Sequence, residues 1–374
     1  MAGEGRGGSA APAAGRRGPV TLRELARQIG VNPSTVSRVL NRDPSVRISD
    51  ATRARIVDLA AALDYRPNRL ARSLKLQRTH IVGMLIPDVT NPHFSALFRA
   101  VEDTAGAAGY QVILGNTDDA AERAARQVEA LSAGHVDGLL IATARRDDPL
   151  VAGLRDRRLP YVLLNRRRDD PADVAVVPDD AQGAHLAVEH LLHLGHRRIA
   201  HVAGSAEVSR SAARLRGFQE ALAAAGCSDE GWIATAGSLD ETAGELGLAR
   251  LLTLPPAERP TAVFAGNDLA AVGVLRAARR VGLRVPGDLA VIGSDDLPAG
   301  RYVEPALTTI RVPVQEMGRL ATELLLGQIE GGGAPGLTPT QVVLPVELIV
   351  RGSTGPPAPV DDALPLPGGE RGPR

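Results

Sequence analysis

The chain has 374 residues, of which 44% are hydrophobic and one is a cysteine. At roughly 100–200 residues per domain, this length predicts two or three domains. The single thiol of Cys227 cannot form an internal disulfide, which excludes a small secreted scaffold and favours the reducing cytoplasm. No apolar run approaches the roughly 20 residues of a membrane helix, and the first residues lack the apolar stretch of a signal peptide. We therefore expect a soluble, cytoplasmic protein.

The 43 basic and 43 acidic residues cancel over the whole chain but are unevenly distributed. Residues 19–78 hold 12 Lys and Arg against 5 Asp and Glu, a balance of +7, and residues 1–18 add +2, so the remainder carries −9. A compact basic segment attached to an acidic body suggests a module that binds a polyanion such as DNA. A basic stretch can also be only a solvated surface, so charge alone does not decide between these interpretations.

Both ends of the chain have the composition of disordered tails. Residues 1–18 are rich in Gly, Ala, Ser and Arg and show no periodicity. Residues 353–374 are dense in Pro and Gly and contain no heptad pattern that could form a coiled coil. We expect disordered tails over 1–18 and 353–374.

The segment TLRELARQIGVNPSTVSRVLN, residues 21–41, has the pattern of a helix-turn-helix. Apolar residues recur at helical spacing in its first half, Gly30 permits a sharp turn, and Val31 fills the space between two helices. Asn32 is a good N-cap and Pro33 suits the first helical position, so the second helix has a defined start. The residues of this helix expected to face inward are Val36, Val39 and Leu40.

Polar residues project from the N-terminal half of the second helix, the end that enters the major groove in this motif. They are Ser34, Thr35, Ser37 and Arg38. A third helix is expected to begin after the cap Ser49 and to run through ATRARIVDLAAALD. An ordinary helical hairpin is the alternative, but the capping, the turn and the charge together favour the DNA-binding motif.

From residue 80 onward, apolar runs alternate with amphipathic stretches such as 92–109. Runs that are apolar throughout and separated by helices indicate parallel βαβ units with both faces of the sheet covered. About 270 residues of this pattern are too many for one sheet, so we expect two α/β lobes that bind ligands beyond the carboxyl ends of their strands. The predicted strands are 81–87, 110–115, 138–143, 161–165, 198–204, 261–266 and 289–295.

The first segment, together with RISDATRARIVDLAAALDYRPNRLARSLK, resembles the DNA-binding headpiece and hinge of the lactose-repressor (LacI/GalR) family of bacterial transcription regulators. The resemblance continues through PDVTNPHF (87–94), HVDGLLI (135–141), LLHLGHRRIAHVAG (191–204), RLRGF (214–218), TAVFAGNDLAAVG (261–273), GLRVPGDLAVIGSDD (282–296) and EPALTTIRVP (304–313), and so covers residues 19–352. It implies an α/β protein with a helix-turn-helix headpiece over 19–65 and a hinge helix and linker over 66–78. Residues 79–352 would form a two-lobed periplasmic-binding-protein-like core of two parallel α/β sheets that binds an effector and dimerises.

The resemblance also places DNA contacts on matching residues. Ser34 and Arg38 take base-reading positions, and Pro33 and Ser34 form the pair that most affects specificity, with Thr35 beside them. Arg38 is the expected guanine reader because its guanidinium can donate to both O6 and N7. Pro33 departs from the polar or aromatic residue commoner at its position, so the operator half-site cannot be taken from a relative. The expected phosphate contacts are Thr21, Ser37, Asn41, Ser49 and Thr52.

Residues 65–75, YRPNRLARSLK, resemble the hinge helix of the family. This segment is too short to be a stable helix alone, and in relatives it forms when two hinges pair over a minor groove. Leu74 takes the position of the leucine that wedges between base pairs, with Asn68, Ala71 and Lys75 alongside it. The alternative makes Leu74 an ordinary linker residue.

For the effector, the resemblance implies contacts from residues at strand ends and in the loops beyond them. They are Asn91, Phe94, Asn165, Asp179, Arg214, Asn267 and Asp295. Carboxylate and amide oxygens accept from hydroxyls and a guanidinium donates, which suits a sugar or polyol. Asn267 could instead cap a helix, and Asp295 could end a strand. Because Leu239 and Val314 replace aromatics found in several sugar-responsive relatives, a non-sugar metabolite stays open.

Other chemistries find little support. Five histidines fall between 185 and 201, but their spacing matches a family surface turn rather than a metal site. We see no P-loop, no GxSxG elbow and no catalytic constellation, so we expect neither an enzyme nor a cofactor or metal. A solute-binding transport protein would need an export signal and no helix-turn-helix. We predict a homodimeric repressor of palindromic double-stranded operator DNA, controlled by a small effector whose identity and sign are open.

Overall fold

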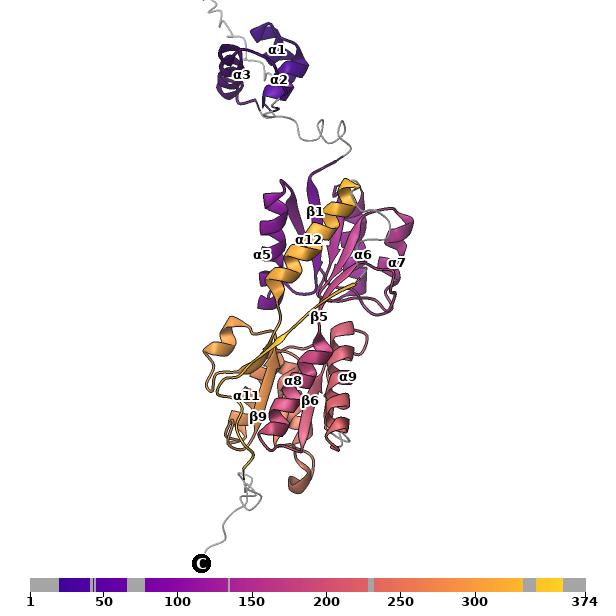
Figure 1. Ribbon diagram of the computed structural model, residues 1–374, viewed down its shortest axis with the longest axis vertical. Helices are drawn as coiled ribbons and strands as arrows, with labels where there is room; N and C mark the ends of the chain where they lie inside the picture. Colours follow the sequence, from indigo (N-terminus) through magenta and orange to yellow (C-terminus); the bar gives the residue numbers. More distant parts are fainter. Residues whose placement is uncertain are drawn as a thin grey trace, which may run out of the picture. The chain divides into compact units, whose positions relative to one another are not determined.

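The computed structural model describes residues 20–40, 43, 45–65, 78–133, 135–227, 232–331 and 341–358. The chain divides into two compact units, Met1–Thr79 and His80–Arg374, which are described separately (Figure 1). None of the described helices is long and apolar enough to cross a membrane.

The N-terminal unit consists of α1 (Leu22–Ile29), α2 (Pro33–Leu40) and α3 (Asp50–Ala62), which confirms the three predicted helices. Thr21 caps α1 in a capping box with Glu24, and Gly30 ends this helix in the left-handed conformation with φ 80°. The Asn32 carboxamide oxygen accepts from the Ser34 amide at 2.9 Å, as expected of an N-cap. Local capping therefore defines where each of the first two helices begins.

Apolar side chains from all three helices form one small core in this unit. Leu25, Val36 and Ile56 are completely buried, one from each helix. Val39 is buried as well, and Leu40 packs against the same cluster while half-buried. The inward-facing residues of α2 agree with the prediction. Of its polar side chains, Ser34 and Arg38 are exposed.

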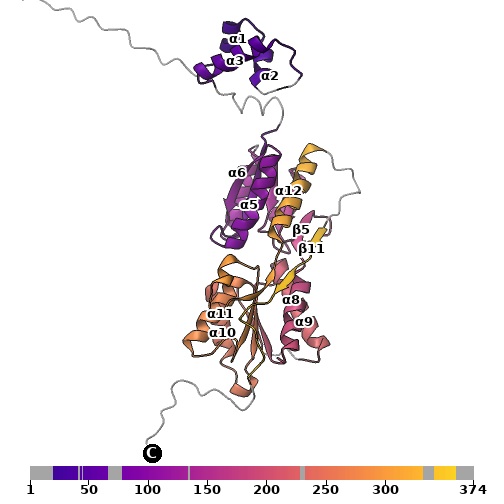
Figure 2. The same cartoon turned by 60° about the vertical axis from the view of Figure 1, so that its left-hand side comes forward.

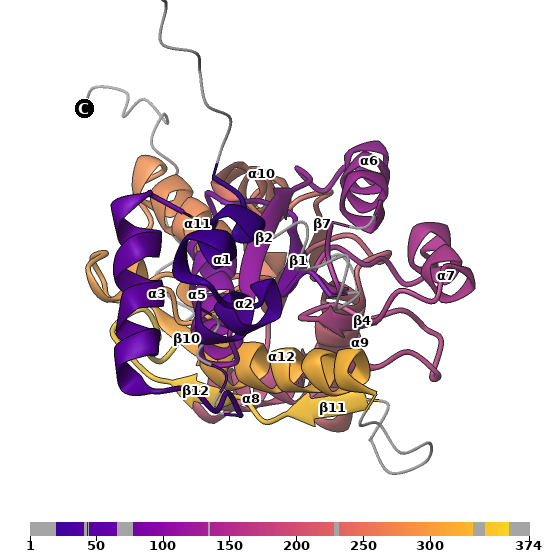
Figure 3. The same ribbon diagram turned by 90° about the horizontal axis from the view of Figure 1, so that it is seen from above.

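The first lobe of the C-terminal unit is built on a six-stranded parallel sheet in the order β11-β5-β4-β3-β1-β2. Helices α5 (Pro92–Ala107) and α12 (Val314–Glu330) cover one face, and α6 (Ala121–Ser132) and α7 (Pro149–Asp156) cover the other (Figure 3). The strands are β1 (Ile81–Ile86), β2 (Gln111–Asn116), β3 (Gly138–Ile141), β4 (Tyr161–Leu164), β5 (Ala175–Pro178) and β11 (Gln341–Leu344).

The second lobe repeats this plan with the sheet order β12-β10-β9-β8-β6-β7, in which only the β10–β12 pair is antiparallel. Helices α8 (Asp180–His193) and α9 (Ser209–Ala224) cover one face, and α10 (Glu241–Leu251) and α11 (Asp268–Arg280) cover the other (Figure 2). The strands are β6 (Ile199–Ala203), β7 (Ile233–Thr235), β8 (Ala262–Ala265), β9 (Ala290–Ser294), β10 (Thr308–Arg311) and β12 (Glu347–Ile349).

The chain crosses between the two lobes three times. It leaves the first lobe after β5, returns from β10 to α12, and passes back from β11 to β12. All seven predicted strands are confirmed, and the two-lobed α/β prediction with them. Sequence analysis missed β5, β7, β10, β11 and β12, which have three or four residues each and lie in shorter apolar stretches or in ones interrupted by polar residues.

The predicted boundary between the core and the C-terminal tail, at residue 352, lies too early. Ser353 is completely buried, and its hydroxyl donates to the Val291 carbonyl at 2.6 Å and accepts from the Thr308 amide at 2.8 Å. The Gly355 carbonyl accepts from His196 Nε2 at 2.8 Å. Residues 353–358 thus continue the second lobe, because their polar groups satisfy strand ends that Pro and Gly content alone does not reveal.

Candidate functional site

The outward face of α2 carries polar side chains at its N-terminal half. Ser34 and Arg38 are exposed, whereas Thr35 and Ser37 are half-buried. The Ser34 hydroxyl donates to the Asn32 carboxamide oxygen at 2.8 Å, so its orientation is set by the helix cap. This face offers donors and acceptors of the kinds that read base edges in a major groove.

Three of the five residues expected to contact phosphates, Thr21, Ser49 and Thr52, lie at helix N-termini, whereas Ser37 lies in the second half of α2. Thr21 precedes α1, and its hydroxyl donates to a Glu24 carboxylate oxygen at 2.9 Å. Ser49 precedes α3, with its hydroxyl 2.9 Å from that of Thr52. Helix N-termini present amide donors to anions. Asn41 and the hinge residues Asn68, Ala71, Leu74 and Lys75 lie outside the described residues.

A cavity of about 430 Å³ lies between the two lobes of the C-terminal unit. Side chains from both lobes line it, and most of them follow the carboxyl ends of strands. Six of the seven predicted effector-binding residues line this cavity. They are Asn91, Phe94, Asn165, Arg214, Asn267 and Asp295.

Helix caps and strand ends position these side chains. Asn91 caps α5 and Asn267 caps α11, where its carboxamide oxygen accepts from the Ala270 amide at 2.9 Å. Capping and lining the cavity are therefore compatible roles for Asn267. Asn165 and Asp295 follow β4 and β9 with φ of 68° and 120°, a backbone region that residues with a side chain seldom adopt.

Asp179 is the predicted residue that does not line the cavity. Its side chain caps α8 by accepting from the Gln182 amide at 3.0 Å. The neighbouring Asp180 is the carboxylate that turns toward the other site residues, and it is 6% exposed. A one-residue step at a helix start changes the direction of a side chain by about 100°. Matching motifs along the sequence could not separate the two adjacent aspartates.

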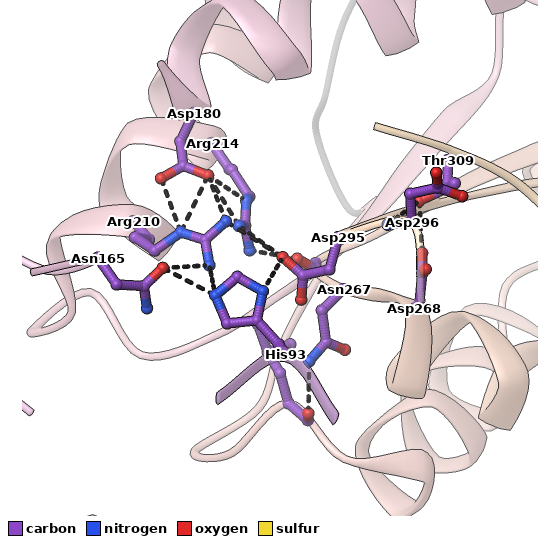
Figure 4. A network of polar contacts seen from close by, with 12 residues as sticks. His93, Asn165, Asp180, Arg210, Arg214, Asn267, Asp268, Asp295, Asp296 and Thr309 are labelled. Carbon is purple, nitrogen blue, oxygen red and sulfur yellow. Dashed lines mark hydrogen bonds and ion pairs between the residues drawn. The ribbon is translucent and has the colours of Figure 1, made fainter. Parts of the chain in front are cut away.

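Arg210 occupies the centre of the polar network and was not predicted (Figure 4). Its Nε donates to Asp180 at 3.0 Å, and its two terminal nitrogens donate to Asn165 at 3.0 Å and to Asp295 at 3.2 Å. It comes from α9 in the second lobe, whereas Asn165 belongs to the first. Arg210 therefore joins the two lobes directly. Its position four residues before Arg214, on the same face of a helix, was the available signal.

Arg214 lies beside Arg210 and shares its carboxylate partners. Its Nε donates to Asp180 at 2.8 Å, and one terminal nitrogen donates to the Gly266 carbonyl. The other terminal nitrogen is 3.9 Å from Asp295. Burial lowers the pKa of Arg214 and the positive charge of Arg210 adds to this, while Asp180 opposes the shift. Two arginines and two aspartates thus form a buried cluster of balanced charge.

His93 contributes a second contact across the lobes. It is 2% exposed, and its Nε2 is 2.9 Å from the Asn165 carboxamide oxygen, which places a proton on Nε2. Its Nδ1 makes no hydrogen bond and faces an Asp295 carboxylate oxygen at 3.4 Å. Burial lowers the pKa of His93 despite the nearby Asp295. His93 therefore lines the cavity and connects Asn165 with Asp295, and sequence analysis missed it.

Direct bonds between the lobes also close the rim of the cavity. The Arg146 amide donates to the Glu207 carbonyl at 2.8 Å, and the Arg145 guanidinium pairs with the Glu207 carboxylate. The Arg167 amide donates to the Ser209 hydroxyl at 3.0 Å. Main-chain and side-chain contacts therefore join the two lobes beside the cavity.

No set of three or more His, Cys, Asp or Glu side chains within the described ranges is placed to hold a metal ion.

Comparisons with known proteins agree with this organisation. Residues 21–68 match the model of bacterial regulatory proteins, lacI family, and residues 188–354 match a periplasmic binding protein-like domain. The ribose operon repressor of Escherichia coli (strain K12) is 36% identical over 334 residues, which are 89% of this chain and 99% of the relative.

Solved structures give the same result. A lac repressor dimer bound to operator and the anti-inducer ONPF is 28% identical with a TM-score of 0.80, over 90% of this chain and 99% of that one. A LacI family regulator from Enterococcus faecium with bound ribose is 32% identical with a TM-score of 0.65, over 74% of this chain and 99% of that one. The chain belongs to the lacI family of bacterial regulatory proteins and is a DNA-binding regulator of transcription.

Proposed function

We propose that this regulator is a homodimeric repressor of a palindromic operator and that a neutral polyhydroxylated molecule in the interlobe cavity controls it. The observation that carries the proposal is the cavity itself, whose walls come from both lobes and whose polar contacts cross between them. A ligand bound there changes the balance between closed and open lobes only if it binds one form better. The buried cross-lobe contacts supply such a difference.

The charges around the cavity favour a neutral ligand. The acidic residues of the lining outnumber the arginines, and the two most buried arginines already pair with Asp180 and Asp295. An anion such as a phosphorylated sugar would have to displace these carboxylates or face the acidic rim. The charged lining residues are Asp88, Asp118, Asp119, Asp240 and Asp295, with Arg166, Arg210 and Arg214.

Hydroxyl groups match the acceptors that remain. The carboxylates of Asp88, Asp240 and Asp295 in the lining can accept from ligand hydroxyls. The volume lies near the lower end of the range for small-molecule sites, as suits a monosaccharide. Phe94 supplies the aromatic face of the lining. Because relatives include a ribose operon repressor and a regulator solved with ribose, D-ribose is the first compound to test.

On the DNA side, we propose that Ser34, Thr35 and Arg38 read base edges, with Pro33 shaping their approach. Thr21, Ser37, Asn41, Ser49 and Thr52 would hold phosphates, and the hinge residues Asn68, Ala71, Leu74 and Lys75 would enter the minor groove. One headpiece makes few base contacts, so specific binding needs two half-sites and therefore a dimer. Leu74→Ala should weaken operator binding without changing effector affinity.

The test is a fluorescence-anisotropy titration of the full chain against a DNA fragment from the gene's own upstream region, with and without a panel of sugars, polyols and nucleobases. Arg38→Ala should abolish the preference for this DNA over a scrambled duplex, while both duplexes keep salt-dependent binding. Operator affinity that changes with one neutral polyol supports the proposal and gives the sign of control. Specific binding that no compound alters overturns the effector assignment, and absence of specific binding overturns the repressor assignment.

A further inference from the structure

The turn that carries Asp295 has an unusual backbone. Asp295 and the following Asp296 have φ of 120° and 51°, both in the left-handed region where glycine is the favoured residue. Two consecutive residues of this kind persist only where surrounding contacts hold them. The Asp295 amide donates to the Ile310 carbonyl at 2.8 Å, which fixes one side of the turn to β10.

The Asp296 amide also donates to the Thr309 hydroxyl at 3.3 Å, and the side chain of Asp296 supplies a further attachment. Its carboxylate points away from the cavity network, and it is 4% exposed (Figure 4). One oxygen pairs with the Arg351 guanidinium, and the other accepts from Arg311 Nε at 2.8 Å. Arg311 is 44% exposed and also forms an ion pair with Glu347, whereas Arg351 is 13% exposed. Arg301 lies 3.6 Å from the same carboxylate and is 57% exposed, so Arg351 is the best shielded of the three arginine partners.

Arg351 is itself rigidly held by the segment that follows β12. Its amide donates to the Thr308 hydroxyl at 2.9 Å, and its guanidinium also donates to the Leu307 carbonyl at 2.8 Å. Two residues further on, buried Ser353 ties the segment to β9 and β10. The guanidinium thus reaches Asp296 from a fixed support and joins the segment after β12 to the turn beside the cavity.

We propose that Arg351 is a positioning residue for effector binding: it holds the Asp295–Asp296 turn in its left-handed form and so keeps the Asp295 carboxylate on Arg210 and His93. Without the ion pair between Arg351 and Asp296, the turn relaxes toward ordinary backbone angles and Asp295 leaves the cross-lobe network. The consequence for ligand affinity rests on the proposed function, whereas the consequence for the turn does not.

The first arm of the test needs no ligand. Native-state hydrogen exchange of the full chain is measured for wild type, Arg351→Ala, Arg351→Lys and Ser353→Ala. Ser353→Ala is the matched control, because it weakens the same segment without removing a partner of Asp296. In Arg351→Ala we expect the amides of residues 295–297 to exchange at least about tenfold faster than in Ser353→Ala. Arg351→Lys keeps the charge and should recover part of the protection.

The second arm measures affinity for D-ribose by calorimetry. Arg351→Ala should weaken binding by about tenfold, while Ser353→Ala, with a comparable loss in Tm, should leave it nearly unchanged. Asp296→Asn should reproduce the effect of Arg351→Ala, and the double variant should be no worse than either single one. Equal exchange of residues 295–297 in Arg351→Ala and Ser353→Ala overturns the positioning role. A wild type that ignores D-ribose counts against the proposed ligand alone, because the exchange arm still decides the role of Arg351.

Discussion

Removal of Arg210 is expected to destabilise the C-terminal unit far more than removal of an exposed arginine. The guanidinium is 7% exposed and lies between the buried carboxylates of Asp180 and Asp295. Breaking a buried ion pair from one side costs about 3–5 kcal/mol, because it leaves an uncompensated charge. Arg214 still faces both carboxylates, at 2.7 Å from Asp180 and 3.9 Å from Asp295, so we expect the lower end, about 3 kcal/mol.

The measurement is urea unfolding of the full chain followed by circular dichroism, comparing Arg210→Met with Arg319→Ala. Arg319 also makes two carboxylate pairs, with Glu316 and Glu323, but it is 44% exposed and screened by solvent, so its loss should cost much less than the loss of Arg210. Asp295→Asn added to Arg210→Met removes the stranded charge and should recover part of the loss. Similar midpoints for Arg210→Met and Arg319→Ala would refute the argument that the Arg210 cluster is desolvated.

Three further outcomes follow from single residues. His201 is fully buried between the rings of Phe218 and Phe264, and burial lowers its pKa to about 4 from 6.5. The folded state then binds fewer protons than the unfolded state between these values, so stability falls by up to about 3 kcal/mol as pH drops from 6.5 to 4. His201→Phe should flatten that part of a plot of Tm against pH, and an unchanged slope would count against this residue as its source. Burial raises the pKa of Asp268 to about 7, helped by Asp295, so its contribution to stability declines as pH rises from 3.8 toward 7. Asp268→Asn should therefore gain more Tm relative to wild type at pH 8 than at pH 5, and an equal difference at both would contradict the raised pKa. Thr21→Ala removes the capping box of α1 and should cost the headpiece about 1 kcal/mol in thermal unfolding, whereas Thr21→Ser should be close to neutral.

The fold was largely predictable because its signals are local. Gly30 ends α1, and Asn32 and Ser49 cap the starts of α2 and α3; these residue types favour such positions, so the sequence alone predicts them. Apolar runs marked seven strands, of which all but the edge strand β2 are almost completely buried. The missed β7, β11 and β12 lie at sheet edges, and β5 and β10 lie inside the sheets but have only four residues each. β11 and β12 also follow a long helix and join different lobes, a topology that no local pattern expresses.

The cavity was predictable only in part, because ion pairing across the fold leaves no periodic signal. Asp180 acts through arginines about 30 residues away in the sequence, and the role of Arg210 depends on partners from three separate segments. Asp179 and Asp180 are chemically identical neighbours, and only the direction of the helix start separates a cap from the carboxylate that pairs with Arg210. For the same reason, the sequence did not distinguish buried Ser353 from the Pro-rich residues that follow it.

The polar network also indicates how ligand binding could be coupled to lobe movement. His93 and Asn165 belong to the first lobe, Arg210 and Asp295 to the second, and Asp180 lies directly after the first crossing between them. His93 Nδ1 and an Asp295 carboxylate oxygen face each other at 3.4 Å from opposite lobes, so this contact depends on how closely the lobes approach. A ligand that bonds to lining residues of both lobes would add contacts that separated lobes cannot make. Closure would then be more favourable with the ligand than without it, and that difference is what a ligand needs to shift the population of the two forms.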